Sequence, residues 1–148
     1  MTIPHTENLH WNEALALDMP QMDDTHREFV DLLSVVLEAP EADVLDAWSA
    51  LIAHTQEHFS MEEKWMHDTA FGPGHGHATH HQFILQVMHE AQQRGASGDI
   101  GAVRQNAHEL GLWFPEHAQT MDASLTRHLQ SVGYDPHTGL IAKPQAPL

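Results

Sequence analysis

The sequence of 148 residues contains no cysteine, and this absence removes a whole group of chemistries. Without a thiol, the chain has no disulfide, no thiolate nucleophile and no sulfur ligand for zinc or for an iron–sulfur cluster. Basic residues are also scarce, because 6 Lys and Arg stand against 21 Asp and Glu, for a formal net charge of −15. Nucleic acids and anionic membrane surfaces require a basic surface, so we expect neither as a partner.

Long apolar runs are missing as well. No stretch approaches the roughly 18 residues of a transmembrane helix, and the opening MTIPHTENLHWN lacks the basic and apolar segments of a secretory leader. We therefore expect a soluble, cytoplasmic protein with no membrane insertion. The length and the 41% of apolar residues are enough for one hydrophobic core. We predict one domain over residues 1–132 and a tail over 133–148, where turn-forming residues are frequent.

Four long stretches of helix-forming residues lie between the prolines and glycines. Apolar residues recur in them at spacings of three and four, which is typical of helices with one buried face. These stretches are residues 23–38, 41–67, 77–94 and 102–132. Because the linkers are short, we predict an all-α, up-down-up-down four-helix bundle with an extended N-terminal arm before Asp23. Pro115 should kink the fourth helix.

Histidine is the residue that the chain has in excess, with 15 copies. Two pairs of polar residues, His58 with Glu62 and His77 with His81, are each four residues apart and therefore share a helix face. Each of the four predicted helices carries at least one residue that could bind a metal, and these residues lie near one level of the bundle. The seven candidate metal ligands are His26, His58, Glu62, His77, His81, His117 and Asp122.

A bound metal explains this set better than ordinary packing does. For a single histidine, a solvated or hydrogen-bonded role is the commoner case. Five imidazoles and two carboxylates facing one core are different, because an unpaired buried carboxylate costs several kcal/mol. Ligands of nitrogen and oxygen without sulfur suit iron, manganese, zinc or copper. Seven ligands are too many for one ion, whereas two ions with bridging carboxylates and a bridging oxo or hydroxo group leave one position for a small ligand such as O2.

The order and spacing of these residues resemble the hemerythrin family, and in particular its single-domain bacteriohemerythrins. The resemblance covers about residues 9–130 and implies a four-helix bundle with a non-haem di-iron centre that binds O2 reversibly. The motifs that carry it are Trp11-Asn12, Met22-Asp23-Asp24-Thr25-His26, His58-Phe59-x-x-Glu62-Glu63-x-x-Met66, His77-x-x-x-His81 and Trp113-Phe114-x-x-His117-x-x-x-x-Asp122.

The resemblance also implies a role for each candidate ligand. Glu62 and Asp122 would bridge two iron ions (Fe2+/Fe3+), together with an oxo or hydroxo group. The iron with the open position would be held by His26 and His58. The three histidines implied for the other iron are His77, His81 and His117.

Apolar residues beside the ligands are candidates for a wall around bound O2, although ordinary core packing would place them similarly. They are Phe29, Phe59, Trp113, Phe114 and Ala118. Phe114 and Ala118 depart from the family, which commonly has an aliphatic residue at the first position and a larger aliphatic at the second. A bulkier Phe114 beside a smaller Ala118 would reshape the pocket or open a path to solvent.

Other polar residues near the motifs are expected to stay outside the site. His80 lies about 100° around the predicted helix from His81, so we expect it to face outward. Glu63 should be exposed, and His54 should lie at the surface or beside the ligands. The histidines assigned to solvent are His5, His10, His67, His89, His108, His128 and His137.

We predict O2 carriage, storage or delivery rather than an enzyme, with O2 as the ligand and an O2-consuming enzyme as a candidate recipient. Neutral imidazoles dominate the set, and a site with less negative charge should stabilise high-valent iron less well, so that O–O cleavage is harder. The alternatives are a di-iron oxidase or peroxidase, a sensor of O2, nitric oxide or iron that would need a partner, and a histidine-rich zinc or nickel buffer.

Overall fold

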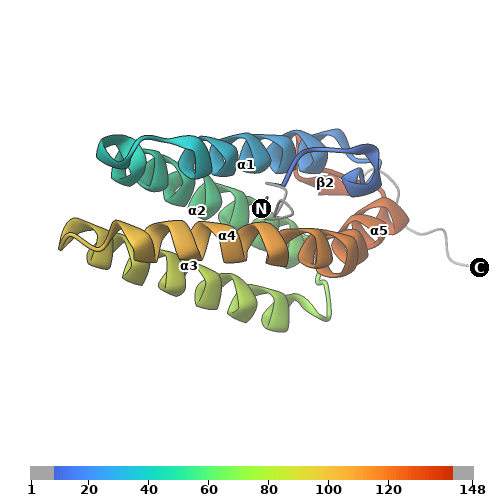
Figure 1. Ribbon diagram of the computed structural model, residues 1–148. Coiled ribbons are helices and arrows are strands. Elements are labelled where there is room, and N and C mark those ends of the chain that lie inside the picture. The colour runs from blue at the N-terminus through green and yellow to red at the C-terminus, as the bar shows by residue number, and fades with distance from the viewer. Residues whose placement is uncertain (1–8, 142–148) are drawn as a thin grey trace, which may run out of the picture.

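Four helical rods lie alongside one another in the computed structural model, which describes residues 9–141 (Figure 1). The first three are α1 (Pro20–Glu38), α2 (Val44–Asp68) and α3 (Gly74–Ala96). The fourth rod consists of α4 (Ile100–His117), a π-helical segment η3 (Ala118–Asp122) and α5 (Ala123–Val132). Two short 3-10 helices are η1 (Glu13–Leu15) and η2 (Glu41–Asp43), and two short strands are β1 (Tyr134–Asp135) and β2 (Leu140–Ile141).

The rods form the predicted four-helix bundle. Each helix contacts the next along the chain, and α1 also contacts α4, so the four rods close into a ring around the core. Figure 1 shows the short connections between consecutive rods, as an up-down-up-down arrangement requires. Within residues 9–141, no helix is both long and apolar enough to cross a membrane.

The helices differ from their predicted bounds mainly at their ends. Helix α1 begins at Pro20, whose fixed φ suits the first helical position, and α3 begins at Gly74 rather than at His77. The second predicted helix is divided into η2 and α2. Pro115 lies inside α4, and the regular helix is interrupted three residues later, where η3 begins.

The N-terminal arm is less extended than predicted. The side chain of Asn12 accepts a hydrogen bond from the backbone N–H of Ala14 at 2.8 Å and so starts η1. Leu15 in this turn is buried in the larger apolar cluster of the bundle. The Asp23 carboxylate accepts the N–H of Leu17 at 2.8 Å, which ties the arm to the first turn of α1. Residues 1–8 of the predicted arm lie outside the described residues.

A short hairpin follows the bundle and is the one departure from all-α structure among the described residues. Gly133 ends α5 with φ of 68°, a left-handed conformation that suits glycine. Strands β1 and β2 then pair antiparallel, with Tyr134 opposite Ile141. The Tyr134 hydroxyl donates to Asp68 at 2.8 Å, so the hairpin lies against the end of α2. Residues 142–148 lie outside the described part, and the division at 132/133 stays a prediction.

Two apolar clusters fill the bundle, and the candidate ligands form a polar layer between them. Along α1, His26 lies between Met22 of the smaller cluster and Phe29 of the larger one. Along α2, Glu62 follows Phe59 of the larger cluster and precedes Trp65 of the smaller one. The fold therefore brings polar side chains from different helices to one depth of the bundle.

Candidate metal centre

All seven predicted ligands meet in this polar layer, and each is buried, with at most 4% exposed surface. Their ligand atoms form two groups, and within each group the atoms lie within 4.8 Å of one another. Glu62 and Asp122 belong to both groups. The first group adds His77, His81 and His117, and the second adds His26 and His58.

Glu62 reaches the two groups with its two carboxylate oxygens. Its Oε1 lies 3.2 Å from Nε2 of His77 and 3.3 Å from Nε2 of His81. Its Oε2 lies beside Nε2 of His58 in the other group. One carboxylate therefore faces both sets of imidazoles, an arrangement that suits a bridging ligand.

Asp122 spans the groups in the same way from the opposite side of the bundle. Its Oδ1 lies 3.1 Å from Nε2 of His77 and 3.2 Å from Nε2 of His117. Its Oδ2 lies 3.0 Å from Nε2 of His26. The two carboxylates thus line one space that the five imidazoles surround.

The π-helical segment η3 explains how Asp122 reaches the same space as His117. In an α-helix, residues five apart point about 140° away from one another. In η3 the backbone N–H of Ala123 bonds to the carbonyl of Ala118, five residues earlier, which widens the turn. The two side chains then meet at 3.2 Å. The spacing of five residues was the only sequence signal for this segment, and it did not predict a π-helix.

Although many of the converging nitrogen and oxygen atoms lie only 3.0–3.3 Å apart, these contacts are not hydrogen bonds. Among the described residues, no hydrogen-bond partner exists for Nε2 of any of the five histidines or for either oxygen of Glu62 and Asp122. Buried polar groups are normally satisfied, and each unsatisfied one is costly. A metal cation between the nitrogen and oxygen atoms would satisfy all of them at once. The donor set, with imidazole and carboxylate but no thiolate, fits non-haem iron.

The electrostatics of the site also favour a cation. Burial acts to raise the pKa of Asp122, but the imidazoles of His117, His26 and His77 together outweigh it and hold that pKa well below its usual range. Burial and Asp122 similarly act to raise the pKa of Glu62, yet His58 and His77 leave it lowered. For His77, burial opposes protonation, but the two carboxylates raise its pKa to about 9. Without metal, the carboxylates are ionised and draw positive charge into the layer.

Glu63 is partly exposed, as predicted, but it also bonds to one of the candidate ligands, which was not predicted. Its side chain is 42% exposed, and its Oε2 accepts the Nδ1–H of His81 at 3.0 Å. A ligand histidine is commonly oriented by such a bond from its second ring nitrogen. The bond leaves Nε2 of His81 directed at Glu62. Because it joins Glu63 of α2 to a residue of α3, the spacing of residues along α2 could not reveal it.

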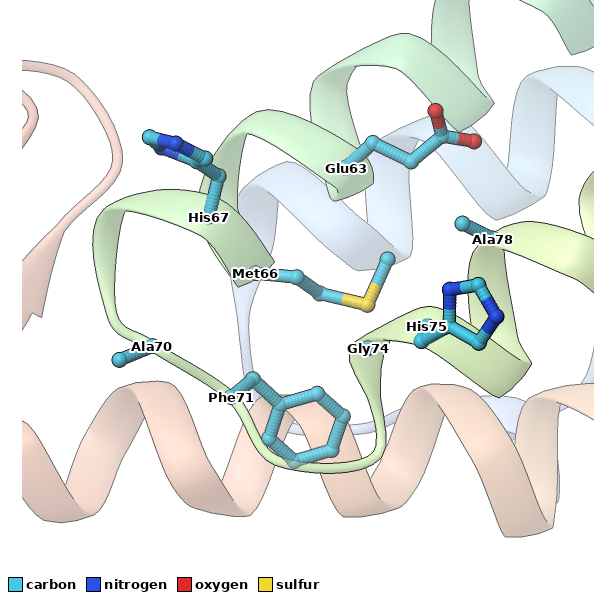
Figure 2. A pocket seen from close by; sticks show the side chains of 8 residues that line it. All are labelled: Glu63, Met66, His67, Ala70, Phe71, Gly74, His75 and Ala78. Atoms are coloured by element: carbon cyan, nitrogen blue, oxygen red, sulfur yellow. The ribbon is translucent and has the colours of Figure 1, made fainter.

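Glu63 also forms one wall of a surface pocket of about 360 Å³ between the end of α2 and the start of α3. Figure 2 shows the Met66 side chain extending between these two segments, with the Glu63 carboxylate on one side of it and Phe71 on the other. The pocket is lined by Glu63, Met66, His67, Ala70, Phe71, Gly74, His75 and Ala78. None of the seven candidate ligands lines it, so it meets the site only through Glu63.

A second pocket, of about 210 Å³, lies against the other ligand group. His58 lines it directly, and the lining also includes Thr25, Glu28, His54, Glu57 and Met61. His54 is half-buried and its Nε2 lies 3.1 Å from the carbonyl oxygen of Thr25, so it sits beside the ligands, as predicted. The ligand group that contains His26 and His58 thus has a surface pocket at His58.

The residues predicted to form an apolar wall occupy two sides of the layer. Phe114 packs edge-on against His26, with ring centroids 5.0 Å apart, and stacks on Phe29 at 4.8 Å. Phe59 stacks on the His81 ring at 3.8 Å. Ala118 is fully buried in the same apolar cluster. Trp113 differs from these residues, because it is only half-buried and stacks on His117 at 4.4 Å.

Several histidines that were expected to face outward or were assigned to solvent have partners or are partly covered. His80 does not simply face outward, because it is half-buried and accepts the Nε1–H of Trp113 at 2.8 Å. His128 is also half-buried and lies 3.0 Å from the Thr69 carbonyl oxygen. His10, His67 and His137 are exposed, whereas His89 and His108 are half-buried, and His5 lies outside the described residues.

Comparison with known proteins agrees with this geometry. Residues 18–129 match the hemerythrin HHE cation binding domain. The bacteriohemerythrin of Ralstonia nicotianae is 39% identical over 127 residues, which cover 86% of this chain and 93% of that protein. The bacteriohemerythrin of Pseudomonas paraeruginosa is 23% identical over 121 residues, or 78% of each chain. The chain therefore belongs to the hemerythrin family.

Proposed function

We propose that this protein binds O2 reversibly at a di-iron centre, for carriage, storage or delivery, and that it is not an enzyme. The observation that carries the proposal is the pair of overlapping ligand groups that share Glu62 and Asp122. Two groups with two shared carboxylates suit a pair of ions better than a single ion. Family membership supports iron as the metal.

The ligand assignment follows the two groups. Glu62 and Asp122 would bridge the iron ions together with an oxo or hydroxo group. One iron would be held by the imidazoles of His77, His81 and His117, and the other by those of His26 and His58. The second iron would have one histidine fewer, which would leave a position for O2. When bound, the iron pair supplies the electrons and the coordination position that O2 binding requires.

The surroundings of His26 and His58 support O2 access on that side. Phe114 covers His26 with apolar surface and is itself backed by Phe29, an arrangement that would exclude water from the site. The pocket at His58 offers a short path from the surface. Phe59, Trp113 and Ala118 complete the apolar surroundings of the ligands, so all five predicted wall residues retain a role in the proposal.

Binding without turnover is favoured by the donor set. Ferritin-like di-iron proteins use more carboxylate ligands, usually in Glu-x-x-His pairs. Here five neutral imidazoles accompany two carboxylates, and less negative charge should make O–O cleavage harder. Delivery to an O2-consuming enzyme and a cytoplasmic location are parts of the same proposal.

Anaerobic reconstitution with Fe2+ tests this function. We expect about two irons per chain, a visible charge-transfer band when O2 is added, and loss of that band when O2 is removed. Irreversible oxidation with peroxide turnover would instead indicate an oxidase or peroxidase. A chain that retains zinc or nickel in preference to iron would indicate a metal buffer. Reversible binding of nitric oxide but not O2 would favour a sensor.

A further inference from the structure

His117 packs against two aromatic side chains that extend toward the surface. The ring centroids of Trp113 and His117 lie 4.4 Å apart, with an angle of 26° between the ring planes. The ring centroids of His80 and His117 lie 5.3 Å apart, with an angle of 19°. Both neighbours are half-buried, whereas His117 is buried. The three rings form a cluster that joins α3, which carries His80, to α4.

A hydrogen bond links the two outer rings. Nε1–H of Trp113 donates to Nε2 of His80 at 2.8 Å, which is good geometry for this kind of bond. An indole has one polar atom, so this bond fixes the rotation of the Trp113 ring about its side-chain bonds. The face that Trp113 presents to His117 therefore depends on His80.

His117 has no polar partner of its own on the side away from the ligand space. Its Nδ1 is buried and has no hydrogen-bond partner among the described residues. His81 differs, because its Nδ1 is held by Glu63. Metal-binding histidines are usually oriented by a bond at the second ring nitrogen, so the orientation of His117 must come from ring packing.

We propose that His80 is a positioning residue for His117. By accepting the N–H of Trp113, it holds the indole against the His117 ring and keeps Nε2 of His117 directed at the shared carboxylates. The inference rests on the proposed role of His117 as a metal ligand. It gives a function to His80, to which the family resemblance assigns no role although it is the neighbour of the candidate ligand His81.

The first test needs no metal. In the metal-free protein, NMR of the Trp113 indole N–H should show at least tenfold faster hydrogen exchange in His80→Ala than in the wild type. His80→Gln should restore slow exchange, because its amide oxygen accepts the same hydrogen bond. His75→Ala is the matched control, since His75 lies exposed on the same helix and should leave the exchange rate unchanged. Equal exchange in His80→Ala and wild type would overturn the proposal.

The second test uses Co2+, whose visible spectrum reports its ligand geometry. We expect His80→Ala to weaken Co2+ binding by about 10–100-fold, as the loss of an outer partner of a ligand histidine does, and to alter the spectrum. Trp113→Phe should have the same effect, and combining the two substitutions should add nothing, because they break one hydrogen bond. His80→Gln and His75→Ala should bind like the wild type.

The outcomes separate this inference from the proposed function. Unchanged Co2+ affinity and spectrum in His80→Ala, or additive effects of the two substitutions, would overturn the positioning role while leaving the metal centre intact. A wild-type protein that binds no Co2+ would refute the ligand role of His117, and the positioning role would fall with it. Circular dichroism of each variant establishes that the helices are retained.

Discussion

Glu62 is the residue on which the pairing of the two ligand groups depends most directly, since its oxygens face imidazoles of both groups. Glu62→Ala should reduce the iron content from about two per chain to one or fewer and abolish the O2-dependent absorption band. The metal content and visible spectrum of the reconstituted variant measure this. Glu116→Ala, which removes an exposed carboxylate from α4, is the control. Two irons and reversible O2 binding in Glu62→Ala would show that the ligand assignment is wrong.

Tyr134 offers a pH-dependent test of the hairpin, because it is the single tyrosine of the chain. Burial, and then its hydrogen bond to Asp68 at 2.8 Å, raise its pKa to about 12. A raised folded pKa means that the folded protein binds the proton more tightly. The contribution of the protonated Tyr134 hydroxyl to the stability of the fold is therefore complete below the ordinary tyrosine pKa of about 10. It is lost as the pH rises through 12.

The tyrosinate absorbance during alkaline titration measures this pKa. Asp68→Asn should lower it toward 10, because the negative acceptor is removed, but not fully, since the burial of the ring remains. Lys64→Ala is the control, because it removes the 2.6 Å bond from Lys64 to the Asp68 carboxylate and leaves the acceptor of the Tyr134 hydroxyl in place. A wild-type transition near pH 10 would contradict the hydrogen bond between Tyr134 and Asp68.

At the scale of elements, the π-helical segment η3 accommodates one residue more than a regular α-helix would have at that point of the fourth rod. A single π-turn of this kind lets the α-helices on both sides keep their own buried faces. Phe114 before it and Leu125 after it are both buried, although they belong to different apolar clusters. The wider turn thus accommodates Asp122 without rotating α5 out of the bundle.

This interpretation predicts opposite effects of removing and adding a residue in η3. Deleting the exposed Thr120 should restore a regular helix and keep Leu125 and Leu129 buried, so that the thermal midpoint changes little. Inserting one alanine after Thr120 should turn α5 by about 100° and expose both leucines, at a cost of roughly 1.5–3 kcal/mol each. Thermal unfolding followed by circular dichroism compares the two variants. Equal destabilisation by deletion and insertion would contradict this account of η3.

The helices were predictable from the sequence because apolar spacing and turn residues act locally. All four rods, and the seven side chains that meet between them, follow from periodicity and from the family motifs. Contacts between helices were not predictable in this way. Glu63 and His80 both lie off the ligand face of their own helices, yet each bonds a residue of a neighbouring helix. These bonds depend on how α3 packs against α2 and α4. The spacing of residues along a single helix does not predict that packing.

For the whole molecule, the polar layer is the proposed metal centre and also a part of the core where buried polar atoms have no hydrogen-bond partner among the described residues. Apolar clusters lie on both sides of it, and we expect them to hold the rods together without metal. The layer itself brings carboxylates and imidazoles from α1, α2, α3 and the fourth rod into one buried space without hydrogen bonds between their facing atoms. Bound metal would therefore connect all four rods at the level of these polar atoms.

Removing the metal should lower the stability of the protein without abolishing its helices. A ligand that binds only the folded state at 100 to 1,000 times its Kd stabilises by about 2.7–4.1 kcal/mol, and for a chain of this size that corresponds to roughly 5–15 °C in Tm. Thermal unfolding before and after treatment with an iron chelator measures the difference, and circular dichroism should show that helix content is retained. Glu62→Ala is the internal comparison, because it should hold less iron and its Tm should therefore respond less to the chelator than that of the wild type. An equal Tm for the wild type with and without iron would contradict the role of the layer as a metal-linked junction of the four rods.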